Sequence, residues 1–401
     1  MTVISNTVIR ATTRRDALTL ALQSITLIAF MAASSVPTPL YRLYQHDWGF
    51  SATLLTVIFA AYAFALLCAL LIAGRLSDHV GRRPVIAAAL LLNILAMLCF
   101  LFASHPYGLI VARIVQGFAT GLATAAVGAA LLDVHPERGS LVNSIAPLTG
   151  MAAGAMLSCA LLAYQFAPLH SGYLLLLGVL VLLLIGLTRT PETGVRRGGA
   201  WASLRPNVAI PPQARAAFWR VTPGNVAVWM VGGFYLSLMP SLLAQNTPAV
   251  SPWLSGVSVA TLTLSGAAAI LLARRTAATP TLRVGALCLI VGMTLMLFAV
   301  HRASTGWLLA GACITGLGFG TAFLGALRSV LPLAKPHERA GLTAVFYIES
   351  YLANSVPAII AGYLTQHLGL ISTTYVYGGV ILTLATLAIG LTFIPQLTKK
   401  K

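Results

Sequence analysis

Charged residues, and acids above all, are scarce in this sequence. Only 8% of the 401 residues are Asp, Glu, Lys or Arg, and eight acids stand against 25 Lys and Arg. A soluble domain carries about 25% charged residues, so the composition excludes an ordinary soluble domain. Apolar residues make up 58% of the chain. Runs long enough to cross a bilayer, about 20 residues each, recur along nearly its whole length and predict an integral membrane protein.

The loops between these runs predict the topology. Basic residues gather in the loops on the side shared by both termini, whereas the opposite loops hold only Arg42 and Arg302. Positively charged loops stay cytoplasmic, so we expect a multi-pass protein of the bacterial inner membrane with both termini cytoplasmic. The net charge of +17 then reflects topology and not binding to nucleic acid. The twelve expected spans are 17–40, 52–73, 84–103, 106–132, 140–163, 170–188, 222–243, 252–273, 281–300, 305–328, 340–364 and 371–395.

The sequence lacks the residue patterns of metal sites, histidine clusters and nucleotide-binding loops. The five cysteines fall inside expected spans without a metal-binding spacing, and none of the eight histidines lies in the middle of a span. No G-x-x-x-x-G-K-[ST] loop is present, which excludes ATP as the energy source. We therefore expect neither an enzyme nor a cofactor or metal, and a proton gradient as the driving force. No cleavable signal peptide is expected, because residues 1–16 are polar and the first apolar run has the length of a span.

The two halves of the sequence repeat each other. Gly117 matches Gly318 at the same offset that separates Glu137 from Glu338. Two six-helix repeats, related by an axis along the membrane normal, form a transporter design with its substrate site near the midplane. We predict an all-α fold of twelve transmembrane helices in two pseudo-symmetric bundles. The expected division is an N-terminal bundle at 1–188, a linker rich in Pro, Gly and Arg at 189–221, and a C-terminal bundle at 222–401.

The loop between the second and third spans reads GRLSDHVGRRP at 74–84. Glycine permits a tight bend, and the aspartate is suited to a helix N-terminus. The stretch resembles the signature loop of the major facilitator superfamily, G-x-L-[SA]-D-x-x-G-R-[RK], at every fixed position. Shorter stretches at 113–117 (RIVQG) and 191–193 (PET) resemble two further motifs of that family. SSVPTPLYRLY at 34–44 also resembles bacterial members.

This resemblance implies a mechanism. Two six-helix bundles would rock to give alternating access, and a single chain would work as a monomer. Asp78 and Arg82 would join a charge network that closes the cytoplasmic side, with Asp78 engaging the start of the eleventh span in the outward-open state. The residues of this expected gate are Gly74, Asp78, Gly81, Arg82 and Arg83.

The fourth span carries an arginine inside its apolar run. Arg113, Gln116 and Thr120 follow one another at spacings of three and four, so they share one helical face. One interpretation gives Arg113 a role in a cavity or in proton coupling, with Gln116 and Thr120 in the substrate cavity. The other lets Arg113 snorkel to the outer headgroups.

The first span ends in a second polar stretch. Pro37 and Pro39 are expected to break the helix near its outer end. Tyr41 and Tyr44 then have two interpretations: interfacial anchors, or, for Tyr41, part of a gate and cavity together with Arg42.

The fifth span contains part of a motif that relates to the direction of transport. Gly150 and Gly154 fit the first two glycines of the G-x-x-x-G-P-x-x-G-G element often found in exporters, but Ala155 replaces the proline. The motif is degenerate, so it leaves the direction open.

Glu349 is the only acid expected in the middle of a span. It stands about 15 Å into the eleventh span at about 1.5 Å per residue, close to the midplane. Acids at this depth mark proton or substrate paths, and the low dielectric there favours the neutral carboxyl group. The alternative is a protonated Glu349 that only packs against a neighbouring helix. Asn354 is a cavity candidate on a different face of the same helix, and the alternative for it is packing within the C-terminal bundle.

These observations favour a proton-coupled secondary transporter that exports small organic or amphiphilic compounds by antiport. Its partners would be the small-molecule substrate, protons and the lipid bilayer. The first alternative is proton-driven uptake of a small metabolite, such as an anion paired with Arg113. A non-transporting membrane sensor or scaffold is a second alternative, but it leaves the loop at 74–84 and Glu349 without a task.

Overall fold

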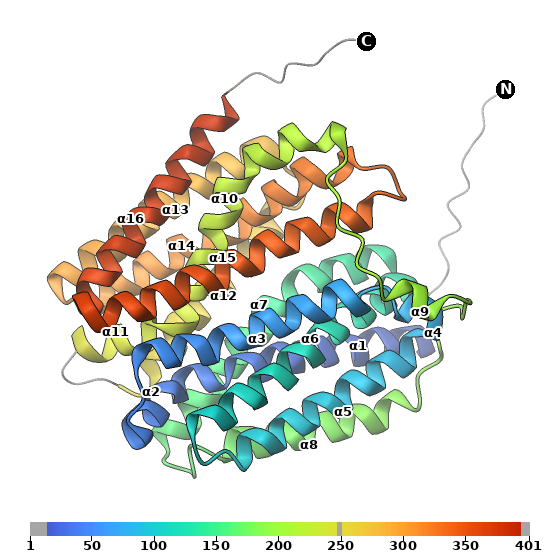
Figure 1. Cartoon of the computed structure of the whole chain (residues 1–401), viewed down its shortest axis with the longest axis horizontal. Helices are drawn as coiled ribbons and strands as arrows, with labels where there is room; N and C mark the ends of the chain where they lie inside the picture. The colour runs from blue at the N-terminus through green and yellow to red at the C-terminus, as the bar shows by residue number, and fades with distance from the viewer. Residues whose placement is uncertain (1–13, 247–250, 394–401) are drawn as a thin grey trace.

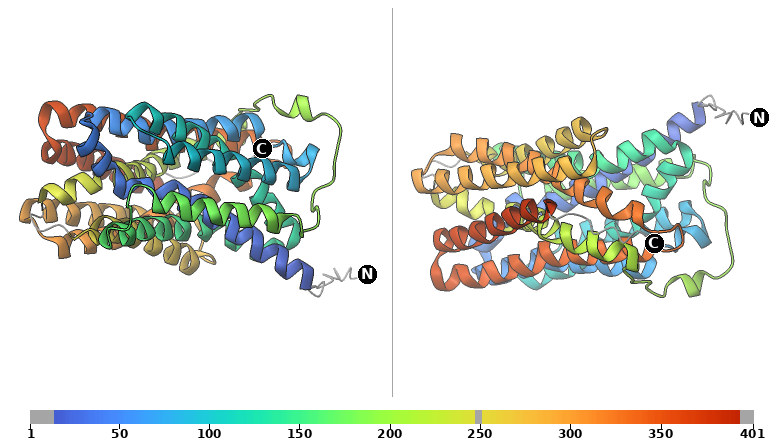
Figure 2. Two further views of the ribbon diagram at one scale, coloured as in Figure 1. Left: turned by 90° about the horizontal axis from the view of Figure 1, so that it is seen from below. Right: turned by 90° about the horizontal axis from the view of Figure 1, so that it is seen from above.

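The computed structural model describes residues 14–246 and 251–393, and the regular structure in this part of the chain is entirely helical. Long helices form two groups that lie side by side, with the first half of the chain in blue to green and the second half in yellow to red (Figure 1). An extended segment joins the two groups along one end of the molecule (Figure 2).

The first group is built from apolar runs that begin at polar caps or prolines. The side chain of Ser51 accepts a hydrogen bond from the N–H of Leu54 at the start of one helix, and a proline opens two others. The helices of this half are α1 (Arg14–Ser35), α2 (Pro37–Trp48), α3 (Ala52–Ala73), α4 (Ser77–Val80), α5 (Arg82–Leu101), α6 (Pro106–Val134), α7 (Pro136–Ala163) and α8 (Ser171–Leu187).

The second group follows the connecting segment in the chain. A short helix, α9 (Ala200–Ser203), precedes it within the connecting segment. The helices of this half are α10 (Pro212–Ser237), α11 (Met239–Asn246), α12 (Trp253–Ala273), α13 (Ala278–Arg302), α14 (Thr305–Val330), the 3-10 turn η1 (Leu331–Leu333), α15 (Arg339–Leu368) and α16 (Leu370–Thr392).

Within the described residues, ten helical segments are long and apolar enough to cross a membrane, and α10 with α11 gives an eleventh if that bent pair counts as one span. The remaining expected span, the sixth at 170–188, corresponds to α8, an apolar helix of 17 residues. The predicted class, an all-α membrane protein with about twelve spans, is confirmed, and the chain is a multi-pass membrane protein.

Two of the spans are broken near the same end of the molecule. The first stops at Ser35 and resumes at Pro37, as the two prolines of that stretch predict. The seventh bends by 57° between α10 and α11. Its first part already begins at Pro212, inside the segment expected to be linker, so the connecting segment without a long helix is shorter than 189–221. The division into an N-terminal bundle, a linker and a C-terminal bundle stays a prediction.

Three core clusters fill the interior of the described part, and the smallest, Leu148 with Ala267 and Ile270, joins α7 to α12. Apart from Ala358, the first large cluster draws its buried side chains from residues 27–187, and the second draws its own from residues 214–385. Glycines set how closely the helices approach. A Cβ on Gly150 would lie 2.7 Å from the Cβ of Met31, so α7 packs directly against α1 at this point. The glycines of the fifth span therefore serve close helix packing here.

The halves meet most firmly at the end that carries α2 and α11, which we call the far end. There Thr53 donates a hydrogen bond of 2.7 Å to Gln366, joining α3 to α15. The N–H of Gly256 in α12 donates to the Sγ of Cys159 in α7 at 3.1 Å. In Figure 1 the two sets of ribbons lie together at the far end and diverge toward α4 and α9, which mark the linker end.

Candidate functional site

Arg113 lies fully inside the first half, with only 1% of its surface exposed. Its Nε donates to the hydroxyl of Tyr41 at 2.7 Å, and its Nη2 donates to the same oxygen. Its Nη1 donates to the carbonyl of Ser34 at 2.8 Å and to Oε1 of Gln116 at 2.7 Å. The rings of Tyr41, Tyr62 and Phe100 surround the guanidinium at 5.3 to 5.9 Å. Because the head group is buried and bound, the interpretation of Arg113 as a snorkelling residue is wrong.

The tyrosines of α2 are not interfacial anchors either. Tyr41 and Tyr44 are 1% and 2% exposed, and the hydroxyl of Tyr44 donates to that of Tyr173 at 3.3 Å. Tyr41 meets the guanidinium of Arg113, whereas Tyr44 meets Tyr173 of α8. Arg42, which was paired with Tyr41 in the gate hypothesis, is instead exposed on another face of the helix.

Gln116 and Thr120 complete the network of α6. Gln116 donates from Nε2 to the carbonyl of Ala33 at 2.9 Å, and Thr120 donates to the carbonyl of Gln116 at 2.8 Å. Both side chains are 0% exposed. In this structure Arg113 and Gln116 of α6 thus bind α1 and α2. The expected part of Gln116 and Thr120 in a substrate cavity stays a prediction.

Glu349 lies in the second half and is partly exposed. Its Oε2 accepts a hydrogen bond of 2.7 Å from Nδ2 of Asn225 in α10. The same Nδ2 donates to the hydroxyl of Ser350 at 3.0 Å. Thr222, one turn before Asn225, also lies within hydrogen-bonding reach of the carboxyl group. Two adjacent residues of α15 therefore share one amide of α10.

Sequence reasoning missed Asn225. It is a lone asparagine close to the start of the seventh span, completely buried, and its Oδ1 has no hydrogen-bond partner. A buried polar residue in an apolar run was the available signal, but its partner on α15 follows only from the packing of the two helices.

Glu349 stands at the border of two faces of α15. Phe346 and Ala353, three residues before and four after it, are buried. Leu352 and Val356, three and seven residues after it, are 40% and 41% exposed. The carboxyl group is therefore held by α10 on one side, and the residue borders the exposed face of α15.

Asn354 occupies a third position. It is 7% exposed, and its Oδ1 would lie 3.4 Å from a Cβ on Gly233 of α10. It thus packs within the second half, away from Glu349, and its expected role in the cavity stays a prediction.

Aromatic rings gather between α10, α14 and α15. Trp229 lies 4.9 Å from Tyr351 and 5.9 Å from Phe323, and Tyr347 lies 6.2 Å from Tyr351, measured between ring centroids. Tyr351 also lies close to Tyr62 of α3, in the opposite half. The Nε1 of Trp229 is buried without a partner. These rings place a polarisable apolar surface where the halves face each other.

The loop at 74–84 is tied to the end of α6. Arg82 pairs with Asp78, donates from Nε to Asp133 at 3.0 Å and from Nη1 to Ser77 at 2.8 Å. Gly81 has a φ of +106°, a backbone conformation that residues with a side chain rarely adopt. Gly74 follows directly on α3 as its cap residue. The loop is therefore a compact charged unit of the first half.

Asp78 and the start of α15 have separate partners in this structure. Asp78 binds Arg82, whereas Glu338, just before α15, accepts hydrogen bonds from Nε2 of Gln213 at 2.6 Å and from the N–H of Lys335 at 3.0 Å. The hydrogen bond from the Lys335 backbone lowers the pKa of the Glu338 carboxyl, so this group is ionised at neutral pH. The contact between Asp78 and the eleventh span, which the resemblance implies for the outward-open state, stays a prediction.

Glu192 of the PET motif has a clear structural task. Its Oε1 accepts from the N–H of Arg82 at 2.7 Å and of Gly194 at 2.9 Å, and its Oε2 accepts from the N–H of Arg83 at 3.1 Å. Arg83 also donates from Nη2 to the carbonyl of Thr188 at 3.1 Å. The carboxylate thus caps the N-terminus of α5, which lacks a capping side chain of its own.

We expect Glu192→Ala to loosen the start of α5. Three N–H groups lose their acceptor, at about 0.5 to 2 kcal/mol for a lost cap. The amides of Arg82 and Arg83 should then exchange hydrogen faster, as measured by hydrogen–deuterium exchange in detergent. Glu137→Ala is the matched control, since Glu137 is an exposed acid in the first turn of α7. Equal exchange rates at the start of α5 in wild type and Glu192→Ala would contradict this role.

The structure therefore forms two separate polar centres. One contains Arg113, Gln116, Thr120 and Tyr41 in the first half, and the other contains Glu349 and Asn225 in the second. Among the described residues, no three His, Cys, Asp or Glu side chains are grouped so that they would bind a metal ion.

Comparison with known proteins adds the family context. The family model of the Major Facilitator Superfamily matches residues 24–353. An uncharacterized MFS-type transporter, YhjO of Bacillus subtilis (strain 168), is 30% identical over 161 residues, 39% of each chain. The multidrug resistance protein MdtL of Klebsiella pneumoniae (strain 342) is 27% identical over 169 residues, 39% of this chain and 43% of MdtL. A gentisate transporter of Corynebacterium glutamicum is 29% identical over 123 residues, 30% of this chain and 27% of that protein. Each match thus spans less than half of the curated relative.

Solved structures match over a longer range. A variant of the nucleoside transporter NupG superposes with a TM-score of 0.73 at 14% identity, covering 93% of this chain and 99% of that structure. The human organic anion transporter MFSD10 (TETRAN) gives a TM-score of 0.69 at 16% identity, covering 94% of this chain and 100% of that structure. At these identities the likeness concerns the fold.

Proposed function

Because the chain belongs to the Major Facilitator Superfamily, and is thus a transporter and not an enzyme, we propose that it exports small organic or amphiphilic compounds in exchange for protons. The two halves would alternate in opening the site between them to either side of the bacterial inner membrane. The termini and the linker end would face the cytoplasm, as the basic loops on that side favour. Glu349 would couple the exchange to protons, and the coupling role that the motif implies for Arg113 stays a prediction.

The position of Glu349 is the observation that carries this proposal. It is the one acid within the described part of any long span, apart from acids in the first or last turns, and the residue is partly exposed. A bound amide on one side and an open side on the other let the group gain and lose a proton without unfolding its surroundings. Ionisable residues at membrane depth serve such exchanges by default.

The surroundings of the two centres favour an apolar cargo. Trp229, Tyr351 and Phe323 offer aromatic surface next to the interface between halves. The guanidinium of Arg113 is already bound to Tyr41, Ser34 and Gln116, so it is not available to hold an anionic cargo in this state. The likeness to MdtL, named as a multidrug resistance protein, points the same way.

Proton-driven uptake is the second candidate. It is favoured by the likeness to the gentisate transporter, which extends over 123 residues, and by the degenerate glycine motif around Gly154. In this case Arg113 would have to release part of its network to meet the substrate.

Transport in liposomes tests both candidates. Purified protein is reconstituted, a pH gradient is imposed, and proton movement is followed with a pH-sensitive dye while lipophilic amines or aromatic carboxylates are added. We expect the amines to move against the proton flow, as in antiport. Movement of a carboxylate together with protons would replace export by uptake. Substrate movement that ignores the pH gradient would contradict proton coupling.

A further inference from the structure

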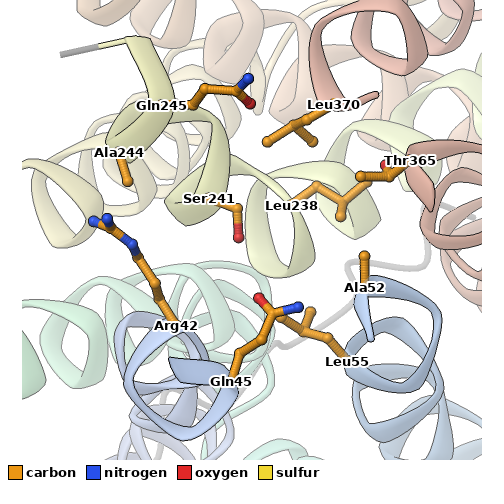
Figure 3. A pocket seen from close by; sticks show the side chains of 10 residues that line it. All are labelled: Arg42, Gln45, Ala52, Leu55, Leu238, Ser241, Ala244, Gln245, Thr365 and Leu370. Carbon is orange, nitrogen blue, oxygen red and sulfur yellow. The ribbon is translucent and has the colours of Figure 1, made fainter. Parts of the chain in front are cut away.

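A cavity of about 420 Å³ lies at the far end, between the two halves. Arg42 and Gln45 of α2 line it from the first half, and Ser241 and Gln245 of α11 line it from the second. Figure 3 shows the side chain of Arg42 extending from α2 toward α11, with the hydroxyl of Ser241 directed into the space between them. The cavity is separate from the buried network of Arg113 and from Glu349.

The polar groups of this cavity have unused hydrogen-bonding capacity. In the described part of the chain, Arg42, Ser241 and Gln245 make no side-chain hydrogen bond or ion pair with the protein. Gln45 donates from Nε2 to the carbonyl of Phe50 at 3.1 Å, which leaves its Oε1 free. The acid on the same helix, Asp47, pairs with His46 at 3.2 Å. The cavity therefore carries one positive charge and neutral donors, without an acid in its lining.

The remaining lining is apolar. Leu55, Leu238 and Leu370 contribute side chains from α3, from the bend between α10 and α11, and from α16 (Figure 3). A volume of this size is within the range of about 300 to 1,000 Å³ that holds small organic ligands. A guanidinium matches a carboxylate in geometry and charge, and leucines suit a short hydrocarbon or aromatic body.

We propose that this cavity is a binding site for a small organic carboxylate. Arg42 pairs with the carboxylate, Ser241 and Gln245 donate to it or to a neighbouring oxygen, and the leucines contact the apolar body. This assignment does not depend on the cargo or on the direction of transport.

Occupation of the site has a consequence for the transport cycle. The lining comes from both halves, so a bound carboxylate bridges them at the end where Thr53 and Gln366 already join α3 to α15. A ligand that binds only the closed arrangement stabilises it by mass action. Carboxylates on the far side of the membrane should therefore hold the far end shut and slow the cycle.

Binding is tested on purified protein with benzoate as the probe and benzyl alcohol as its uncharged control. We expect benzoate to raise the thermal unfolding midpoint with saturation, and Arg42→Gln to weaken its apparent affinity by about tenfold or more, as loss of a charge-assisted bond implies. Arg302→Gln is the matched control, because Arg302 is an exposed arginine at the end of α13 and is not part of the lining. An equal loss of affinity in Arg302→Gln, or an equal response to benzyl alcohol, would overturn the proposal.

A second variant covers the case in which Arg42→Gln does not fold. Ser241→Ala removes one donor from α11 and should weaken benzoate binding severalfold while the protein stays folded. In oriented liposomes, benzoate should slow wild-type transport from the far side and not from the linker side. Inhibition of equal strength from both sides, or unchanged affinity in Ser241→Ala, would also count against the site. A failure here leaves the antiport result above unaffected, since antiport is measured with lipophilic amines and without a carboxylate.

Discussion

Replacing Glu349 by glutamine is expected to abolish substrate-driven proton movement, to the level of liposomes without protein. Glutamine has the shape of the protonated acid, and its Oε1 still accepts the hydrogen bond from Asn225, so the free energy of unfolding should change by less than about 1 kcal/mol. What it loses is the ability to release and regain a proton. The measurement is dye-reported proton flux in liposomes, next to thermal unfolding of the same preparation.

Glu338→Gln is the control for this experiment. Glu338 lies just before the same helix and is bound by Gln213 and by the N–H of Lys335. Its side chain is outside the span, so coupling should persist in this variant. Unaltered coupling in Glu349→Gln would refute the proton role of Glu349. Loss of coupling together with a large drop in unfolding midpoint would instead assign Glu349 to packing.

The architecture was predictable from the sequence because membrane spans are read from length and apolarity alone. Each of the twelve runs corresponds to a helix or a helix pair in the structure, including the break between Ser35 and Pro37. The boundary before Pro212 was less accurate, since α10 extends beyond the apolar part of its span. A helix keeps its backbone hydrogen bonds after it leaves the membrane. It can therefore extend beyond its apolar run, and apolarity alone does not predict where it begins.

The partners of the site residues were not predictable in the same way. Glu349 was identified because an acid in an apolar run is rare, but Asn225 lies 124 positions away and meets it only through the packing of α10 on α15. Tyr41 had two interpretations, an interfacial anchor, as tyrosines near span ends often are, or part of a gate and cavity. In the structure its hydroxyl accepts a hydrogen bond from Nε of Arg113. Hydropathy locates a helix, and tertiary contacts decide where its side chains point.

The two halves use their polar residues differently. Arg113 is enclosed by bonds to three residues of the first half, whereas the carboxyl group of Glu349 is held on one side only. A change in the protonation of Glu349 would therefore alter the contact between α10 and α15 directly. The network of Arg113 would respond only if α1 or α2 moved relative to α6. This difference separates a group suited to exchange from a group suited to holding helices together.

Arg113→Ala is accordingly expected to be the most destabilising of the substitutions considered. It removes every bond of the guanidinium and leaves the carbonyl of Ser34 and Oε1 of Gln116 buried without this donor. Each such loss costs about 1 to 3 kcal/mol, so the free energy of unfolding should fall by about 3 to 5 kcal/mol, as for a broken buried charge network.

Arg113→Lys separates charge from geometry. Lysine keeps the positive charge but not the planar fork that reaches Tyr41, Ser34 and Gln116 together. We expect a smaller loss of about 1 to 3 kcal/mol, with transport reduced in proportion to the loss of folded protein. The unfolding midpoint in detergent and the transport rate per folded molecule are the two readouts.

Arg328→Lys serves as the comparison for Arg113→Lys. Arg328 is partly exposed and donates to the carbonyls of Ala273, Arg274 and Thr276 at the end of α12. Water can replace these bonds, so the change should cost less than about 1 kcal/mol. Equal destabilisation by the two lysine variants would show that burial of the Arg113 network does not matter. A fully folded Arg113→Lys protein without proton coupling would instead move Arg113 from a structural role to the coupling role that its motif implies.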